Sequence, residues 1–374
     1  MNRIFKSVVF TLSMILSGCT DAAPPVVLGR VPDGGIQPQL ISDREGGVRL
    51  LYYKHLNSDS KQGHLYYRKY VAVSQRWLKP IQVATTAYRN AGTIGRASMA
   101  LDDRGRLHVS WFSINPASYY YSRSNLQKSR FEAERSLLTV DLSEVEAAAD
   151  VAVYRDRVTL SWHAGPLDSE PARTVFTMTS VDGGETFSHA TETGDTELGA
   201  CACCSLAADF SSEGTLIVGY RSAVNGEGRH MQLLSVGDGT TDTKLIHQWQ
   251  LNACPVSTNY LSRDTNKRHW MVFETQGSIY QVLLAGKETT PTLVRAPQEK
   301  TRQKHPAMAF NSAGERVVVW GEGFGFFSGG DLALQLFSSV GDPTSSVDTK
   351  GLNIPDNSFA SVTALQDGSF LVLY

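Results

Sequence analysis

Seven short apolar runs along the chain each end on one aromatic residue, and this regular spacing constrains the fold more than any other feature of the sequence. The aromatics are Tyr52, Trp111, Trp162, Tyr220, Phe273, Trp320 and Tyr374. Neighbouring aromatics are 47 to 59 residues apart, and most runs follow a second apolar run and a turn rich in Asp, Gly or Asn. A repeating unit of about 50 residues, built from strands and tight turns, predicts small antiparallel sheets arranged around one axis.

The predicted fold is all-β: a single β-propeller, with seven blades favoured and six as the alternative. Each blade has four antiparallel strands, from an innermost strand A to an outermost strand D. In the first repeat we expect these strands at residues 39–42, 48–53, 64–71 and 81–84. The last repeat, residues 359–374, supplies only strands A and B. We therefore expect residues 26–29 to pair with it as an outer strand, which closes the propeller of residues 26–374 without free sheet edges.

Residues 1–19 have the features of an export signal. Arg3 and Lys6 form a charged start, and the apolar stretch that follows is too short to span a bilayer as a helix. The stretch ends in Leu-Ser-Gly-Cys at Cys19, which resembles the bacterial lipobox. We therefore predict a lipoprotein signal peptide, with acylation (palmitate) at Cys19. The alternative is an ordinary cleaved secretory signal.

Acylation would anchor the protein in a membrane of the bacterial cell envelope, with residues 20–25 as a short tether. The residue after the cysteine is Thr20, whereas an Asp there retains lipoproteins at the inner membrane under the enterobacterial rule. The outer membrane is therefore the favoured location. The formal net charge is only −2 and no long basic run occurs, which argues against nucleic acid as a partner. We expect a monomer.

One turn, between strands C and D of the third repeat, carries a complete Ser-x-Asp-x-Gly-x-Thr-aromatic motif. Its residues are Ser180, Asp182, Gly184, Thr186 and Phe187. We expect the Asp182 carboxylate to accept backbone N–H groups inside the turn, while Gly184 allows a positive φ and Phe187 anchors the turn to the sheet. Degenerate copies occur at the equivalent turns of the second and fourth repeats.

This motif matches the Asp-box, and the chain resembles the sialidase-like (BNR/Asp-box repeat) propellers over nearly all of residues 26–374. The resemblance implies the propeller fold, with the Asp-box on the face opposite the active site. Sialidases of this family clamp a carboxylate with three arginines, and use a Tyr/Glu pair as nucleophile and an Asp as acid/base. Their aromatic-Arg-Ile-Pro segment in the first inner strand has no match here, because the nearest string, around Arg30, precedes that strand.

The cysteines that follow the signal concentrate at one place in the predicted ring. Cys201, Cys203 and Cys204 lead into strand A of the fourth blade, and Cys254 leads into strand A of the fifth. His305 leads into strand A of the sixth blade. Because the segments that enter the A strands share one face of a propeller, we expect all five side chains at the mouth of the central channel.

Three hypotheses account for the four cysteines. In an oxidising compartment they form disulfides, with Cys254 bridging to one of the triplet and a second, strained pair within it. Alternatively, thiolates bind copper or zinc, with His305 as a further ligand. A redox-active pair is the third hypothesis. His305 also has a simpler interpretation, as a packed or capping residue.

Further candidate ligand-binding residues lie on the same face. They are Arg96, Arg221, Arg229, Trp320 and Glu322. Arg221 ends strand B of the fourth blade and is predicted to bind a carboxylate or phosphate, with Arg229 beside it and Arg96 as a third candidate. The alternatives are ordinary loop charge for the arginines and blade packing for Trp320, which recurs at the repeat period.

Three functions are compatible with these observations. The first is a cell-envelope protein that binds a ligand or a soft metal at the Cys/His cluster. The second is an exo-acting sialidase-type glycoside hydrolase that uses Arg221 and Arg229 against an acidic sugar. The third is a non-catalytic scaffold for protein interactions. A glycan or a small acidic molecule is the expected ligand, and the sequence identifies no catalytic residue.

Overall fold

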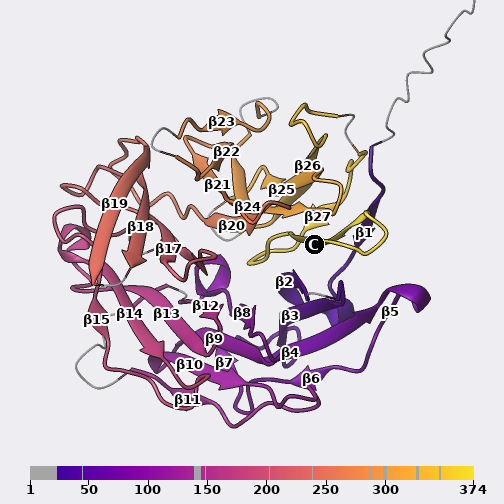
Figure 1. Cartoon of the computed structure of the whole chain (residues 1–374), viewed down its shortest axis with the longest axis horizontal. Helices are drawn as coiled ribbons and strands as arrows, with labels where there is room; N and C mark the ends of the chain where they lie inside the picture. Colours follow the sequence, from indigo (N-terminus) through magenta and orange to yellow (C-terminus); the bar gives the residue numbers. More distant parts are fainter. Residues whose placement is uncertain are drawn as a thin grey trace, which may run out of the picture.

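The computed structural model is a closed ring of small sheets around a central axis (Figure 1). It describes residues 23–43, 45–138, 145–147, 149–201, 203–237, 239–286, 289–297, 301–325, 328–344 and 347–374. The predicted signal with Cys19 and the first part of the tether lie outside these described residues. Within them, no helix is long and apolar enough to cross a membrane.

The first three blades follow the chain in order. Blade one contains β2 (Ile36–Ser42), β3 (Val48–His55), β4 (Gln62–Val71), β5 (Arg76–Trp77), β6 (Ile81–Gln82) and β7 (Tyr88–Arg89). Blade two contains β8 (Ser98–Leu101), β9 (Leu107–Ile114), β10 (Ala117–Arg123) and β11 (Arg135–Ser136). Blade three contains β12 (Asp150–Tyr154), β13 (Arg157–Ala164), β14 (Thr174–Ser180) and β15 (Thr191–Glu192).

The next three blades repeat the four-stranded pattern. Blade four contains β16 (Ala207–Phe210), β17 (Leu216–Arg221), β18 (Met231–Gly237) and β19 (Thr240–His247). Blade five contains β20 (Asn259–Arg263), β21 (His269–Thr275), β22 (Ser278–Leu283) and β23 (Thr292–Leu293). Blade six contains β24 (Gln303–Phe310), β25 (Arg316–Glu322), β26 (Gly330–Phe337) and β27 (Asn353–Ile354). The described helices are 3-10 turns: η1 (Pro32–Gly34), η2 (Ala72–Ser74), η3 (Gly92–Gly95) and η5 (Glu170–Ala172).

The seventh blade joins the two ends of the described chain. β28 (Ser361–Ala364) and β29 (Phe370–Leu373) are antiparallel, and β1 (Val26–Gly29) pairs with β29 in parallel. The described residues therefore form seven blades, and the predicted closure by the N-terminal strand is confirmed. The outer strand expected at residues 81–84 is present but shorter, as β6, and the two-residue segments β5 and β7 also pair with β4.

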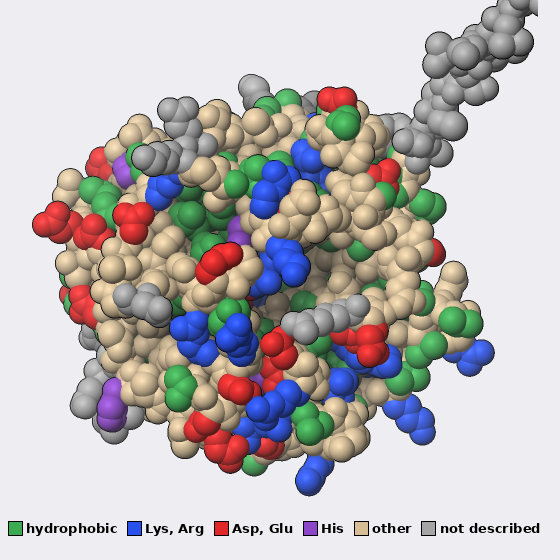
Figure 2. Space-filling view, viewed as in Figure 1, with side chains coloured by type: hydrophobic (Ala, Val, Ile, Leu, Met, Phe, Trp, Pro, Cys, Tyr) green, Lys and Arg blue, Asp and Glu red, His purple; other side chains and the backbone are tan. Residues whose placement is uncertain are grey.

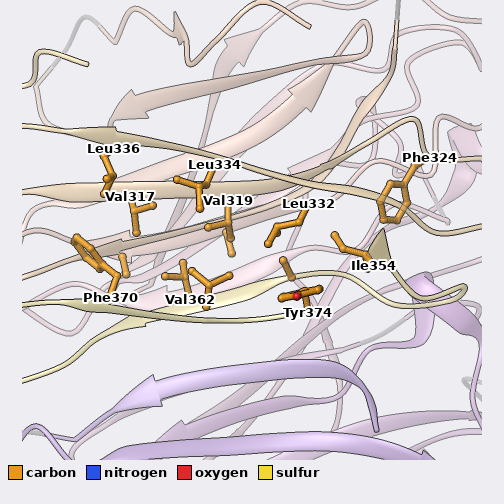
Figure 3. Packing of buried hydrophobic residues seen from close by; sticks show 14 residues of the cluster. Val317, Val319, Phe324, Leu332, Leu334, Leu336, Ile354, Val362, Phe370 and Tyr374 are labelled. Atoms are coloured by element: carbon orange, nitrogen blue, oxygen red, sulfur yellow. The ribbon is translucent and has the colours of Figure 1, made fainter. Parts of the chain in front are cut away.

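The periodic aromatics explain why the repeat produces this ring. Six of them lie in the second strand of their blade and Tyr374 directly follows β29, and all seven are at most 7 % exposed. Adjacent blades bury alternate residues of their strands against one another, because residues two apart in a strand share a face. Between blades six and seven, Val317, Val319 and Leu334 lie opposite Val362 and Phe370 (Figure 3).

The Asp-box turn has the internal bonds that its motif predicts. The Asp182 carboxylate accepts the backbone N–H of Thr186 at 2.9 Å and its hydroxyl at 2.6 Å. Gly184 has a φ of +80°, a conformation that glycine adopts without strain. Phe187 packs edge-on against Tyr121 of blade two, with ring centroids 4.9 Å apart. The turn therefore also joins blade three to blade two.

The two faces of the ring differ. On one, here called the A–B face, the turns between the first and second strands of five blades line a funnel of about 1060 Å³. The Asp-box belongs to this face, since Gly183 donates its N–H to the carbonyl of Asp156 in such a turn, at 2.8 Å. The opposite face, here called the entry face, carries the segments that enter the first strands. Figure 2 shows the molecule hollowed near the centre of the ring.

Candidate functional site

The cysteines gather on the entry face, between blades four and five. Cys201, Cys203 and Cys204 lie in the segment that enters β16, and Cys254 lies in the segment that enters β20. Cys203 and Cys254 form a disulfide, so the predicted bridge between Cys254 and the triplet is confirmed. This disulfide ties together two neighbouring entry segments that share no strand pairing.

Cys201 and Cys204 remain thiols, so the second disulfide expected within the triplet does not form. Both are fully buried, and their Sγ atoms lie 3.0 Å apart. The Sγ of Cys201 is also 3.6 Å from that of Cys203, and the Sγ of Cys204 accepts the backbone N–H of Ser257 at 3.4 Å. The entry face therefore holds a buried dithiol directly beside a disulfide.

The two thiols are not equivalent electrostatically. Burial disfavours the thiolate of Cys204, but the hydrogen bond from Cys201 and the charge of Arg221 outweigh it and lower the pKa of Cys204. The N–H of Ser257 and the charge of Lys304 act in the same direction. Burial and the neighbouring Cys204 raise the pKa of Cys201 well above its usual value. Of the two thiols, Cys204 is therefore the one that loses its proton more readily, and Cys201 donates the hydrogen bond between them.

His305 does not join the sulfur cluster. Among the described residues, the grouped metal-ligating atoms are the sulfurs of Cys201, Cys203 and Cys204. His305 lies in β24, where the pairing register with β25 shifts, and it has a φ of +54°. Its ring packs edge-on against Phe324, 5.4 Å between centroids. Burial lowers its pKa well below the usual value, so the ring is neutral.

Arg221 is 1 % exposed at the end of β17, and both of its Nη groups are occupied. Nη1 donates to the carbonyl of Arg229 at 2.6 Å, and Nη2 donates to Ser257 Oγ at 3.1 Å and to the carbonyl of Glu274. The guanidinium also stacks on Trp249, 5.0 Å from the ring centroid. Arg221 is therefore a brace between blades four and five, and a bound carboxylate would have to displace these bonds.

The remaining arginines do not complete a clamp. Arg229 is buried and forms an ion pair with Glu170 at 2.6 Å. Arg96 lies apart from both, on the axis of the ring, with its guanidinium 4.8 Å over the ring of Phe359. The structure thus places Arg221 and Arg229 side by side but does not bring Arg96 to them.

Trp320 and Glu322 belong to the interior of blade six. Trp320 is fully buried, and its Nε1 donates to Glu322 Oε1 at 3.0 Å. Gln303 Nε2 donates to the same oxygen at 3.0 Å. Trp320 therefore packs within its blade, in keeping with its recurrence at the repeat period.

A pocket of about 310 Å³ opens on the entry face between blades five and six, beside the disulfide. We call it the entry-face pocket. Its lining residues that carry charge, an aromatic ring or sulfur are Trp249, Cys254, Glu274, Arg302, Lys304, His305 and Phe324. Two of the residues predicted from the sequence, Cys254 and His305, thus line a real cavity.

Sequence reasoning missed the other walls of this pocket. Trp249 is half-buried in the connection between β19 and β20, outside the repeat position that explains the core aromatics. That off-period position is the signal that could have identified it. Lys304 is buried in β24 and forms an ion pair with Glu274 at 3.1 Å. Nothing in the local sequence distinguishes this lysine from a solvated one.

Neither a protein-family model nor a curated protein matches the chain. Solved structures do. A protein of unknown function from Dyadobacter fermentans is 12% identical, with a TM-score of 0.55, and the match covers 86% of this chain and 95% of that chain. A lectin from Aleuria aurantia in complex with Fucα1-6GlcNAc is 10% identical, with a TM-score of 0.52 and coverage of 84% and 96%.

An α-L-arabinanase from Penicillium chrysogenum, complexed with arabinobiose, is also similar. It is 9% identical, with a TM-score of 0.53, and the match covers 80% of this chain and 91% of that chain. At these identities the likeness establishes the fold alone. The β-propeller predicted from the repeat and from the Asp-box is confirmed.

Proposed function

We propose that the protein is a lipid-anchored protein of the bacterial cell envelope that binds the end of an acidic glycan in the entry-face pocket. The observation that carries this proposal is the combination of Trp249 and Phe324 with Arg302 around one cavity. Aromatic rings pack against sugar faces, and cationic groups bind carboxylates. The volume of about 310 Å³ is at the lower end of the usual range for ligand pockets, about 300–1,000 Å³.

The charge of the pocket favours an anionic ligand. Lys304 and Glu274 neutralise each other, and His305 is neutral because burial lowers its pKa. Arg302 is exposed and lines the same cavity, which leaves an excess of one positive charge among the described lining residues. A carboxylate on a sugar would pair with this guanidinium while its ring lies against the aromatic wall.

The chemistry of the pocket favours binding over hydrolysis. Two-carboxylate glycoside hydrolysis needs an acid and a nucleophile or base on opposite sides of the scissile bond. Among the described residues that line the pocket, Glu274 is the sole carboxylate, and it is held by Lys304 and by the N–H of Gly277 at 2.7 Å. The likeness to a lectin and to an arabinanase, each solved with a sugar, supports a carbohydrate ligand.

Calorimetric titration with sialyllactose, galacturonic acid oligomers and neutral lactose tests the proposal. We expect an acidic sugar to bind, and Trp249→Ala to weaken binding at least tenfold while the protein stays folded at the temperature of the titration. The matched control is Trp77→Ala, because Trp77 packs against Tyr70 in blade one, remote from the pocket. Equal affinity of the Trp249 variant, or binding of lactose as tight as that of the acidic sugars, would refute the proposal.

The sulfur cluster supports a second candidate function, the binding of one Cu(I) ion. The Sγ atoms of Cys201, Cys203 and Cys204 lie within 4.8 Å of one another, and soft thiolates select Cu(I). With Cys203 in a disulfide, two thiols remain, which suffices for two-coordinate Cu(I) but not for tetrahedral zinc. Anaerobic titration against a Cu(I) chelator should show one retained ion, lost in Cys201→Ser and in Cys204→Ser. Retention by both variants, or none by the wild type, would exclude this site.

The lipid anchor rests on the sequence around Cys19. We expect labelled palmitate to be incorporated into the protein in a bacterial host and to be absent from Cys19→Ala. Density separation of the membranes should place the acylated protein in the outer membrane, because Thr20 replaces the Asp of the retention rule. Secretion of the wild type without label would favour an ordinary signal peptide instead.

A further inference from the structure

A separate cavity of about 50 Å³ lies on the axis of the ring. Its lining comes from the innermost strands of all seven blades or from the residues that directly precede them. The lining residues that carry a charge or an aromatic ring are Arg96, Asp150, Tyr260, His305 and Phe359. We call it the axial cavity. It is distinct from the entry-face pocket, with which it shares His305 alone among the described lining residues.

Arg96 supplies the chemistry of this cavity. It directly follows η3 and lies two residues before β8, and its half-buried side chain lines the cavity. Its Nε and Nη2 atoms are buried and have no hydrogen-bond acceptor among the described residues. One contact is with the ring of Phe359, 4.8 Å from the guanidinium, which offers no acceptor for these N–H groups. Buried donors without acceptors are rare in native proteins, and each needs an explanation.

The nearest opposite charge does not satisfy Arg96. Asp150 enters the same cavity from blade three and attracts Arg96 electrostatically. Its oxygens already accept the N–H of Val151 at 3.0 Å, the N–H of Ala208 at 2.7 Å and the hydroxyl of Ser98. Burial raises the pKa of Asp150, so its negative charge is itself disfavoured. The positive charge of Arg96 is therefore incompletely compensated.

We infer that the axial cavity binds one small monovalent anion, such as a halide, which accepts the free N–H groups of Arg96. The size of the cavity suits one small ion, because roughly 10–15 Å³ is enough for one water molecule and the axial cavity has about 50 Å³. The single guanidinium of Arg96 can pair with a monovalent ion, whereas a dianion would leave an unpaired buried charge. Such an ion would contact residues of several blades at once and so help to hold the blades together.

The axial cavity adjoins the funnel on the A–B face. The axial cavity and the funnel on the A–B face share the lining residues Gln39, Asp150, Ala207 and Tyr260. The charged side chains that line this funnel are of both signs, for example Arg155 and Lys267 beside Asp102. Entry from this face leaves the entry-face pocket undisturbed, so the inference is independent of the proposed glycan binding.

Crystals soaked in bromide test the inference directly. We expect one anomalous peak within hydrogen-bond distance of Arg96 Nε and Nη2. The peak should vanish in Arg96→Met and persist in Arg104→Gln, a control that removes an exposed rim charge. Water alone at Arg96 in the wild type, or an axial bromide retained in Arg96→Met, would overturn the inference. The wild-type map decides on its own if Arg96→Met does not fold.

A solution measurement adds a second, independent readout. At constant ionic strength, replacing gluconate by chloride should raise the Tm of the wild type, because an ion bound to the folded state stabilises it by mass action. The rise should be absent in Arg96→Met and unchanged in Arg104→Gln. An equal rise in wild type and Arg96→Met would place the stabilising ion elsewhere and contradict the inference.

Discussion

Removal of the Lys304 ammonium tests whether the entry-face pocket is built on a buried ion pair. Its Nζ is 3.1 Å from Glu274 Oε2 and also donates to the carbonyl of Pro255 at 2.6 Å. The two charged side chains are only 9% and 1% exposed, so solvent screens the pair little. In Lys304→Met the Glu274 carboxylate stays buried with the N–H of Gly277 as its remaining partner. Breaking a buried pair on one side lowers the free energy of unfolding by about 3–5 kcal/mol.

A double-mutant cycle separates this charge effect from lost packing. Glu274→Gln keeps an oxygen that accepts the N–H of Gly277, so the Glu274→Gln/Lys304→Met variant should recover about 1–3 kcal/mol relative to Lys304→Met. Urea unfolding at pH 7 measures all four proteins. The exposed pair of Arg104 and Asp156, 2.8 Å apart, is the control, and Arg104→Met should change stability by under about 1 kcal/mol. A loss below that value in Lys304→Met, or a double variant as unstable as the single one, would refute the buried-pair reasoning.

Three further variants test other parts of the molecule. Phe370→Ala should lower the free energy of unfolding by about 3–5 kcal/mol, because Phe370 is fully buried between blades. In the same urea assay the control Val27→Ala, on the exposed side of β1, should have little effect. Cys254→Ala removes the disulfide and should lower that free energy by about 2–4 kcal/mol, and an unchanged urea midpoint would show that the disulfide does not constrain the chain. Burial and the charge of Arg173 lower the pKa of His163 to about 3. Between pH 6.5 and 3 the unfolded chain therefore binds a proton that the folded chain does not bind. The free energy of unfolding should decrease as the pH is lowered through this window, by up to about 1.4 kcal/mol per pH unit. Unfolding measured from pH 7 to pH 4 should have a shallower slope in His163→Gln, and parallel slopes would contradict the assignment.

The fold could be predicted from the sequence because its buried residues recur at regular intervals. Each blade buries one large aromatic in or directly after its second strand, so the spacing of Trp111, Trp162 and Trp320 reports the repeat directly. The closing strand was predictable for a related reason, since the last repeat lacked an outer strand and residues 26–29 lacked a partner. The outer edge of blade one was only partly predictable, because the short segments β5 and β7 also pair there with little side-chain pattern.

Only part of the candidate site could be predicted from the sequence. The position of the cysteines followed from where each enters its blade, and the bridge to Cys254 was foreseen. The role of Arg221 was not, because its acceptors include the carbonyl of Glu274, which is 53 residues away in sequence. The same holds for Arg96, whose buried N–H groups become visible only when all seven blades enclose the axis. Partner choice across blades is a tertiary property, which local spacing does not encode.

The pairing of β1 with β29, which closes the ring, also limits when the chain can complete its folding. β1 is synthesised among the first residues of the body, yet Phe370, which lies opposite Val26, is 344 residues further along. At roughly 5–20 residues per second, tens of seconds separate the synthesis of the two strands. Contacts between such distant segments also form slowly once both are present. Until β1 and β29 have paired, their backbone edges are open to other chains. We therefore expect the soluble yield to be more sensitive to substitutions in β29 than in an equally buried strand of blade three.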